Sequence, residues 1–327
     1  MERPATDAID RQILQVLSLQ ARAPFRTIAD VVGVSDQTVA RRYRRLCDVA
    51  GLRVLGVVRA EQAGWVDWMV RLHTTPGGAG PIADALARRP DTRWVRLFSG
   101  GTEIVCVVQA RTAEQRNALF LRGLPGSRRV VQISAQATLH TFSPVAWAGL
   151  RGALSPAQLG RLTSRPTAAP PRQGDPVSLR EDDEVLLAEL VRDGRASNAA
   201  LAAATHWHES TVRRRVAELT DAGLLYFDVD LDDSVFGIGV AAMLWLSIEP
   251  ARLAEAGPML AGLPEVPYAA AMTGTHNLVG TGAFRDTQHL YEFLTGPLAG
   301  LPGLREVESA PIIGTFKRSG PLAAAPG

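Results

Sequence analysis

The chain repeats itself at a constant spacing, and this repeat constrains its fold more than any other feature. Residues 35–46, SDQTVARRYRRL, resemble residues 208–219, HESTVRRRVAEL. Asp10 and Asp183 are separated by the same 173 positions as these two segments. A fixed offset across separate segments is the signature of a duplicated unit. We therefore expect two copies of one module in tandem.

Composition narrows the class of protein. The chain has 327 residues and a net charge of only +2, so any basic surface must be local rather than spread along the chain. Cys47 and Cys106 show no metal-ligand spacing, and two isolated thiols favour a reducing compartment without a disulfide framework. The N-terminus has no apolar run typical of a signal peptide. We expect a cytoplasmic protein that does not enter the membrane, with no cofactor, metal site or catalytic residue.

The segment between the copies is rich in Pro, Ser, Ala and Gly. Residues 164–177, SRPTAAPPRQGDPV, have almost no apolar periodicity and are typical of an extended linker. We expect a first helix-turn-helix domain, a first effector and dimerisation domain, a linker, the same two domains again and a disordered tail. The predicted bounds are 1–58, 59–148, 149–177, 178–232, 233–318 and 319–327.

The first third of the first copy predicts a helix-turn-helix. Apolar residues recur with helical spacing over 7–20 and 25–32, and Gly33 then breaks the second helix. Ser35 is a favourable N-cap for a third helix, which ends at Gly51. That helix is expected to turn Val39, Tyr43 and Leu46 inward, and its other faces carry Arg41, Arg42, Arg44 and Arg45.

The second copy repeats the pattern. Its second helix is expected near 199–204, and its third ends at Gly223. The first helix is expected to bury Val185, Leu186, Leu187 and Leu190. On the third helix we expect Val212, Val216 and Leu219 inward, with Arg213, Arg214 and Arg215 outward.

A third helix of this kind can enter the major groove of double-stranded DNA. Arginine neutralises phosphates and pairs with guanine, and short polar residues at the helix start reach bases or phosphates. The alternative is a solvated basic helix on a bundle. The candidate DNA contacts are Ser35, Gln37, Thr38, Arg41, Arg42 and Arg45 in the first copy and His208, Ser210, Thr211, Arg213, Arg214 and Arg215 in the second.

The remaining two-thirds of each copy predicts a βαββαβ order, the ferredoxin-like arrangement of an α+β protein. The strands and helices of the first copy are expected at 66–72, 82–88, 94–98, 104–109, 113–121 and 130–141. Those of the second are expected at 240–248, 253–263, 266–272, 278–284, 287–298 and 305–316. Helices cover only one face of such a sheet, so we expect sheet-to-sheet association, which the repeat permits within one chain.

These segments resemble the Lrp/AsnC family of transcriptional regulators. The resemblance is carried by residues 193–201, DGRASNAAL, by 210–219, STVRRRVAEL, by 222–237, and by the turns TGT at 273–275 and LPG at 301–303. It implies a winged helix-turn-helix joined to an effector-binding domain that dimerises and often assembles further. It also implies double-stranded DNA as partner, an amino acid or small metabolite as effector, and a homo-oligomer, either dimer or tetramer.

In the resembled family the effector lies near a turn that reads Gly-x-x-Asp, after the second strand. Asn277 and Glu103 stand where that Asp is usual. A neutral Asn lacks the carboxylate that could hold a ligand ammonium group, and a plain turn without ligand is the alternative. The effector candidates are Gly100, Gly101, Thr102 and Glu103 in the first copy and Gly274, Thr275, His276 and Asn277 in the second.

The chain resembles a fused dimer whose two reading helices differ in sequence. Protein two-fold symmetry is what makes an operator palindromic, so we expect two non-identical half-sites per chain.

Two alternative functions stay open. Siroheme decarboxylases share the tandem architecture, although their His- and Arg-rich strand motifs are not found here. The chain could also be an oligomeric scaffold with a disabled helix-turn-helix.

Overall fold

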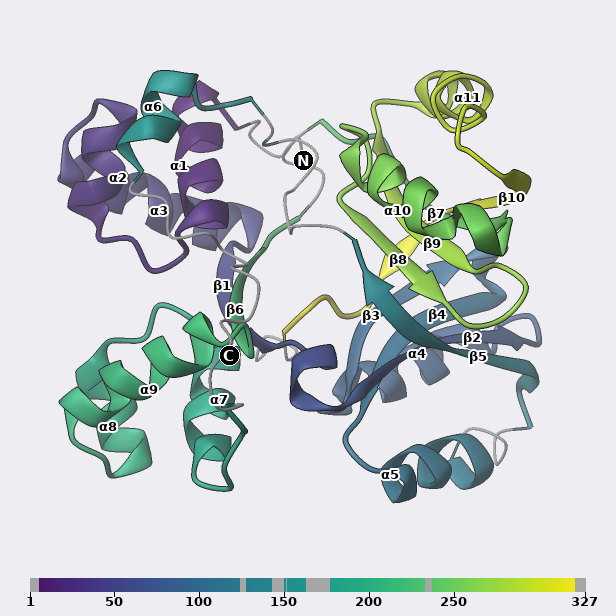
Figure 1. The fold of residues 1–327 in the computed structure, drawn as a ribbon, viewed down its shortest axis with the longest axis horizontal. Coiled ribbons are helices and arrows are strands. Elements are labelled where there is room, and N and C mark those ends of the chain that lie inside the picture. Colours follow the sequence, from purple (N-terminus) through teal and green to yellow (C-terminus); the bar gives the residue numbers. More distant parts are fainter. Residues whose placement is uncertain are drawn as a thin grey trace. The chain divides into compact units, whose positions relative to one another are not determined.

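The computed structural model describes residues 6–123, 128–142, 150, 152–162, 177–232 and 237–320. Most of the expected extended segment at 164–177 and most of the expected tail at 319–327 lie outside these residues. The chain divides into two compact units, and each takes one part from each copy (Figure 1). Unit 1 contains Met1–Ala63 and Pro144–Gly237, and unit 2 contains Gly64–Ser143 and Ile238–Gly327. No helix of the described residues is long and apolar enough to cross a membrane.

Three helices form the first module of unit 1, bounded by local signals in the sequence. The Asp7 carboxylate accepts a hydrogen bond from the backbone N–H of Asp10 and caps the first helix. Gly33 and Gly51 end the second and third helices at φ of 84° and 62°, a left-handed conformation that favours glycine. The helices are α1 Ala8–Leu19, α2 Phe25–Val32 and α3 Asp36–Ala50.

The second module has the same three helices, α7 Asp183–Arg192, α8 Asn198–Thr205 and α9 Glu209–Asp221. His206 takes the place of Gly33 in its turn and has a φ of 58°. Leu186, Leu190 and Val212 are fully buried, as expected for the inner faces of α7 and α9. The prediction for Val185 is wrong, because 48% of its surface is exposed on the outer side of α7.

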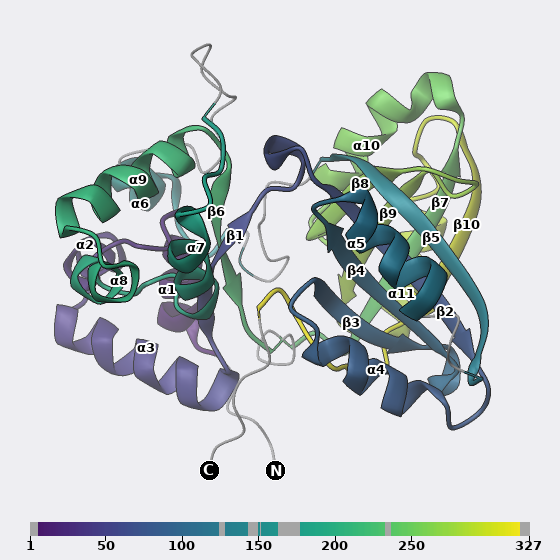
Figure 2. The same ribbon diagram turned by 90° about the horizontal axis from the view of Figure 1, so that it is seen from below.

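The two modules of unit 1 pair directly through one strand each. Strand β1 Arg53–Val58 runs antiparallel to β6 Leu225–Asp230 (Figure 2). Gly194 packs against this ladder, and its N–H donates to the carbonyl of Val54 at 2.6 Å. A Cβ on Gly194 would lie 2.9 Å from that carbonyl oxygen, so a residue without side chain is required for this approach.

The first part of the expected linker is folded. Residues Pro156–Arg161 form helix α6, which packs on α2 of the first module. The side chains of Gln158 and Arg161 donate to the carbonyls of Val31 and Asp30, at the end of α2 where carbonyl groups lack helical partners. Leu150 and Leu154 are buried beside it. The predicted linker at 149–177 thus contains a short helix in its first part, before the segment 164–177 that was expected to be extended.

Unit 2 contains both βαββαβ repeats, which confirms the predicted α+β fold class. The first has β2 Val66–Thr74, α4 Ala79–Arg88, β3 Thr92–Phe98, β4 Glu103–Ala110, α5 Ala113–Asn117 and β5 Val130–Thr141. The second has β7 Val240–Ile248, α10 Leu253–Gly262, β8 Tyr268–Met272, β9 Leu278–Phe284, α11 Thr287–Thr295 and β10 Leu304–Pro311. Across the described residues the strands are hydrogen-bonded in the order β10-β7-β9-β8-β5-β2-β4-β3-β11.

The last strand of each repeat crosses to the other repeat. The end of β5, from Thr138 to Thr141, pairs with β8. In the same way β11 Gly314–Thr315 pairs with β3 of the first repeat. The prediction of one continuous strand over 305–316 is wrong, because the chain leaves β10 at Pro311 and reaches the other repeat before it pairs again.

A central apolar layer joins the two repeats. Helices α4 and α5 cover one side of the first repeat, and α10 and α11 cover one side of the second. The opposite sheet faces meet each other, which confirms the predicted sheet-to-sheet association within one chain. The layer between them is formed by Met69, Phe98, Val105, Met243, Trp245, Ala270, Met272, Val279 and Ala310.

Candidate nucleic-acid interface and effector turns

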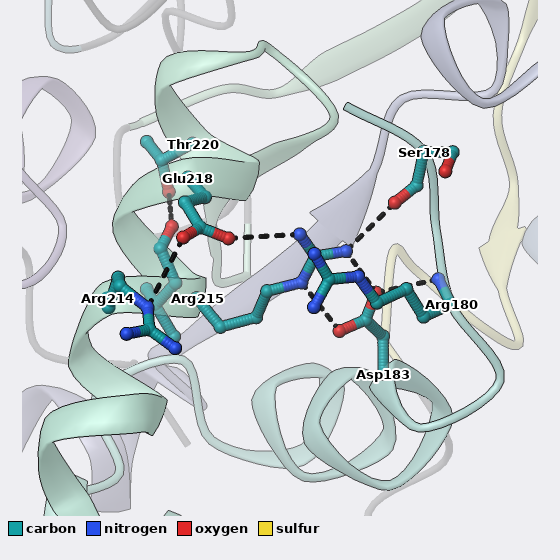
Figure 3. A network of polar contacts seen from close by, with 8 residues as sticks. Ser178, Arg180, Asp183, Arg214, Arg215, Glu218 and Thr220 are labelled. Atoms are coloured by element: carbon teal, nitrogen blue, oxygen red, sulfur yellow. Dashed lines mark hydrogen bonds and ion pairs between the residues drawn. The ribbon is translucent and has the colours of Figure 1, made fainter. Parts of the chain in front are cut away.

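A buried ion pair holds the third helix of the second module on its first helix. The guanidinium of Arg215 donates to both carboxylate oxygens of Asp183 at 2.8 and 2.6 Å (Figure 3). It also donates to the carbonyl of Ser178 and to Glu218. The side chains of Arg215 and Asp183 are only 5% and 1% exposed. The prediction that Arg215 lies outward for DNA is wrong, because this guanidinium is enclosed within the module.

The charged state of Asp183 depends on these partners. Burial raises the pKa of its carboxyl, but hydrogen bonds from Arg215 and from the backbone N–H of Arg180 outweigh burial. The net effect is a pKa below the usual range for aspartate, so the carboxylate stays ionised beside Arg215.

The first module has the equivalent pair with one more arginine. Arg42 donates to Asp7 at 2.6 Å and to Asp10 at 2.9 Å, and Arg45 also binds Asp10. Asp10 has no exposed surface, so its carboxylate is fully compensated inside the module. Arg42 and Arg45 therefore join α3 to α1, and of the two DNA-contact candidates Arg42 is largely enclosed whereas Arg45 keeps 43% of its side chain exposed.

The remaining candidate DNA contacts lie at the surface. Ser35 and Gln37 are exposed on α3 and its cap, and Arg41 is exposed one turn further along. Thr38 is half-buried, and its backbone N–H donates to the Ser35 hydroxyl, the predicted N-cap. The corresponding exposed residues of the second module are His208, Ser210, Arg213 and Arg214, with Thr211 half-buried.

One exposed residue was missing from the candidate set. Arg44 lies three residues after Arg41 and seven after Gln37, so all three share one face of α3. Helical spacing alone could have placed Arg44 with the DNA-contact candidates.

Two equivalent arginines connect the modules reciprocally. Arg22 donates to the carbonyls of Gly194 and Ala196 at 2.6 and 2.8 Å. Arg195 donates to the carbonyls of Ala21 and Ala23 at 2.5 and 2.8 Å. Such an exchange is the pattern of a two-fold interface, here formed inside one chain. We call this pair the arginine clamp.

Aromatic rings support the arginine clamp on both sides. The Arg22 guanidinium lies 5.7 Å from the ring centre of Phe227. The guanidinium of Arg195 lies 5.0 Å from Phe25 and 5.4 Å from Tyr43. These are favourable cation–π distances. The sequence offered one signal for the clamp, since Arg22 and Arg195 are themselves separated by the repeat spacing.

In the first effector turn, the candidate residue Glu103 already binds an arginine of the protein itself. Gly100 and Gly101 have φ of 66° and 91°, and the turn places Glu103 only 1% exposed. The carboxylate of Glu103 accepts from the Ser99 hydroxyl at 2.7 Å and from Arg71. Arg71 also donates to Glu308 at 2.9 Å and lies 4.3 Å from the ring centre of Trp245.

The second effector turn is built differently. The Asn277 side chain accepts from the N–H of Ile248 and donates to its carbonyl, both at 2.9 Å. Gln136 from the first repeat donates to the carbonyl of Thr273 at 2.8 Å, next to Gly274 with φ of 99°. The two positions where the family Asp is usual are thus both engaged by protein groups. Within the described part of the chain, no cluster of His, Cys, Asp and Glu could hold a metal ion.

The Arg71–Glu308 pair predicts an acid-dependent loss of stability. Hydrogen bonds from Arg71 hold the pKa of Glu308 below its usual range, against the opposite effect of burial. This contribution is fully present above the ordinary glutamate pKa of about 4.3 and is lost as pH falls through the lower folded value. We expect the melting temperature of Glu308→Gln to depend less on pH in this acidic range than that of the wild type. Glu306→Gln, on the same strand, is the control, and parallel curves for all three proteins would contradict the expectation.

Comparison with known proteins agrees with this geometry. The family model of the AsnC-type helix-turn-helix domain matches residues 7–46 and 181–220, and that of the Lrp/AsnC ligand binding domain matches 241–322. An uncharacterized HTH-type transcriptional regulator of Pyrococcus abyssi is 32% identical over 145 residues, 44% of this chain and 91% of the relative. The regulator AldR of Mycolicibacterium smegmatis is 28% identical over 123 residues, 36% of this chain and 72% of the relative.

A solved structure shows the same tandem fold. The siroheme decarboxylase NirDL superposes with a TM-score of 0.60 and 12% identity, over 95% of this chain and 93% of that one. At this identity the likeness concerns the fold alone.

Two AsnC-type helix-turn-helix modules together with an Lrp/AsnC ligand binding domain define a DNA-binding transcriptional regulator. The chain belongs to the Lrp/AsnC family, which confirms the predicted family and the main predicted function.

Proposed function

We propose that one chain binds DNA as a self-contained pair of modules that contacts two non-identical half-sites. The arginine clamp supports this proposal most directly, because it joins both helix-turn-helix modules within unit 1. The β1–β6 ladder adds backbone hydrogen bonds between the same modules. The exposed residues of the two reading helices differ, with Gln37 at the position of Ser210 and Arg44 at that of Ala217.

The proposal predicts the symmetry and stoichiometry of the complex. Unbiased selection from random DNA should return a bipartite site whose halves differ, since the two helices present different side chains. Titration with one selected site should show that a single chain suffices for each bipartite site, so that an assembly of several chains binds several sites. A perfectly palindromic operator that needs two chains would contradict the proposal.

We also propose that a small metabolite or amino acid modulates this binding at an interface between the effector domains of unit 2. The second turn, Gly274 to Asn277, is the better candidate, because the buried Nε2 of His276 has no hydrogen-bond partner among the described residues. Asn277 carries no charge, so a ligand here would not be held through an ammonium–carboxylate pair. The test is to add each of a panel of metabolites to the protein. An effector should raise the melting temperature of the protein and change its affinity for the operator.

A siroheme decarboxylase-like activity is the second candidate, favoured by the fold shared with NirDL over nearly the whole chain. The exposed arginines on α3 and α9 favour the regulator. Incubation of the pure protein with the tetrapyrrole separates the two candidates, because an enzyme of that class should bind it and absorb visible light.

We propose that the regulator acts on the chromosome in the cytoplasm and that chains assemble further in even numbers. The paired effector domains already form within one chain the kind of interface that identical subunits commonly form. Light scattering after size-exclusion chromatography would determine whether the chain is a monomer, dimer or tetramer.

A further inference from the structure

The two reading helices have equivalent positions in the fold but different exposed charges. On α3, Arg41 and Arg44 are exposed, and neither forms an ion pair with a residue that the structure describes. On α9, the equivalent of Arg41 is Arg214, which lies 3.4 Å from Glu218, and the equivalent of Arg44 is Ala217. At these two positions the first helix therefore offers two cations without an ion-pair partner among the described residues, whereas the second offers a paired cation and a methyl group.

Helical spacing places these differences on the face opposite the core. Gln37, Arg41 and Arg44 follow at intervals of four and three residues, whereas Val39 and Leu46 are buried on the other side of α3. The acidic residues on these helices are mostly shared, because Asp36 and Asp48 have Glu209 and Asp221 at the equivalent positions. Their effect on the comparison of the two helices is small.

Other positions of the two modules increase the contrast. Arg26 is exposed in the first turn of α2, and its equivalent on α8 is Ala199. The acidic Glu218 on α9 replaces Arg45 of α3. Helix α9 has one cation that α3 lacks, Arg213 at the place of Ala40, and it reduces the contrast in part. Arg213 is exposed and forms no ion pair with a described residue.

We infer that the two modules contribute unequally to the binding of DNA phosphates. The first module supplies most of the phosphate contacts, and the second module supplies few of them. Each arginine that neutralises a phosphate releases bound counterions, which makes affinity fall with salt. Unpaired arginines do this more effectively than arginines that already bind a carboxylate. This inference rests on the proposed binding of one chain through both modules.

The test compares matched pairs of arginines in the full-length chain on one selected site. The slope of log affinity against log salt falls by about 0.9 for each lost phosphate contact. We expect Arg41→Ala with Arg44→Ala to reduce the slope by about 1–2. Arg213→Ala with Arg214→Ala should reduce it by less than about 1. Ala217→Arg, the reciprocal of Arg44→Ala, should increase the slope.

The outcomes distinguish this inference from the proposed function. Equal reductions for the two pairs, or a larger one for the second pair, would overturn the division between modules while DNA binding by both stood. A wild-type chain without salt-dependent binding would overturn the proposed function itself. Unchanged circular dichroism and melting temperature for all variants would show that the side chains, rather than folding, account for the slopes.

Discussion

Replacing Arg215 with alanine should destabilise unit 1 by about 3–5 kcal/mol, because the change leaves a buried carboxylate without its cation. Asp183 is 1% exposed and receives two hydrogen bonds from Arg215. Without Arg215, Asp183 must either stay charged in a poorly solvated site or take up a proton, and both cost free energy. The carbonyl of Ser178 also loses its guanidinium partner.

The measurement is equilibrium unfolding in urea, followed by far-ultraviolet circular dichroism. Arg214→Ala is the matched control, since Arg214 is the adjacent residue and 72% of its side chain is exposed. It should change stability by no more than about 0.5 kcal/mol. Equal unfolding midpoints for the two variants would show that the buried pair does not hold α9 on α7.

The first module should tolerate the equivalent change better. After Arg42→Ala, Arg45 still binds the Asp10 carboxylate, so the buried charge keeps one partner. We expect a smaller loss than for Arg215→Ala in the same assay. Arg41 and Arg214 are therefore the better residues for probing DNA contact, because substitution of Arg42 or Arg215 would mix a folding defect with a binding defect.

Removing the arginine clamp should lower affinity for the full two-half-site operator by about 10- to 100-fold, because a second module bound through a fixed linkage gains from high effective concentration. In the double variant Arg22→Ala with Arg195→Ala, four carbonyls lose charge-assisted hydrogen bonds across the module interface. The β1–β6 ladder still joins the modules, so each module should stay folded and paired, but their relative orientation should become less fixed.

Fluorescence anisotropy with a full site and with an isolated half-site separates this effect from lost contact. Half-site affinity and the salt slope should be unchanged, since both clamp arginines bind protein carbonyls. Arg11→Ala with Arg192→Ala removes two exposed arginines from the first helices of the modules and serves as the control for charge. Equal losses on the full site and the half-site would contradict a role in coupling the modules.

Local signals in the sequence determined much of the secondary structure. Helix α2 and strands β5, β7 and β9 have the predicted bounds. Apolar periodicity, the Ser35 cap and the breaks at Gly33 and Gly51 act within a few residues, so they can be interpreted without the rest of the chain. The repeat spacing predicted the pairing of sheet faces, because two copies of a one-sided sheet must each cover an apolar face.

Only the tertiary structure decided which polar side chains bind other protein groups and which are left exposed to a partner. Helical spacing places Arg215 beside the buried Val212 and Leu219, three residues after the one and four before the other, but it does not show that Asp183 of α7 lies there to bind it. The crossing of β11 to β3 and the arginine clamp join residues far apart in the chain. Such contacts depend on how elements pack, which short-range patterns do not specify. The sequence by itself thus determined the modules and their family, whereas packing decided which arginines bind protein and which are left for DNA.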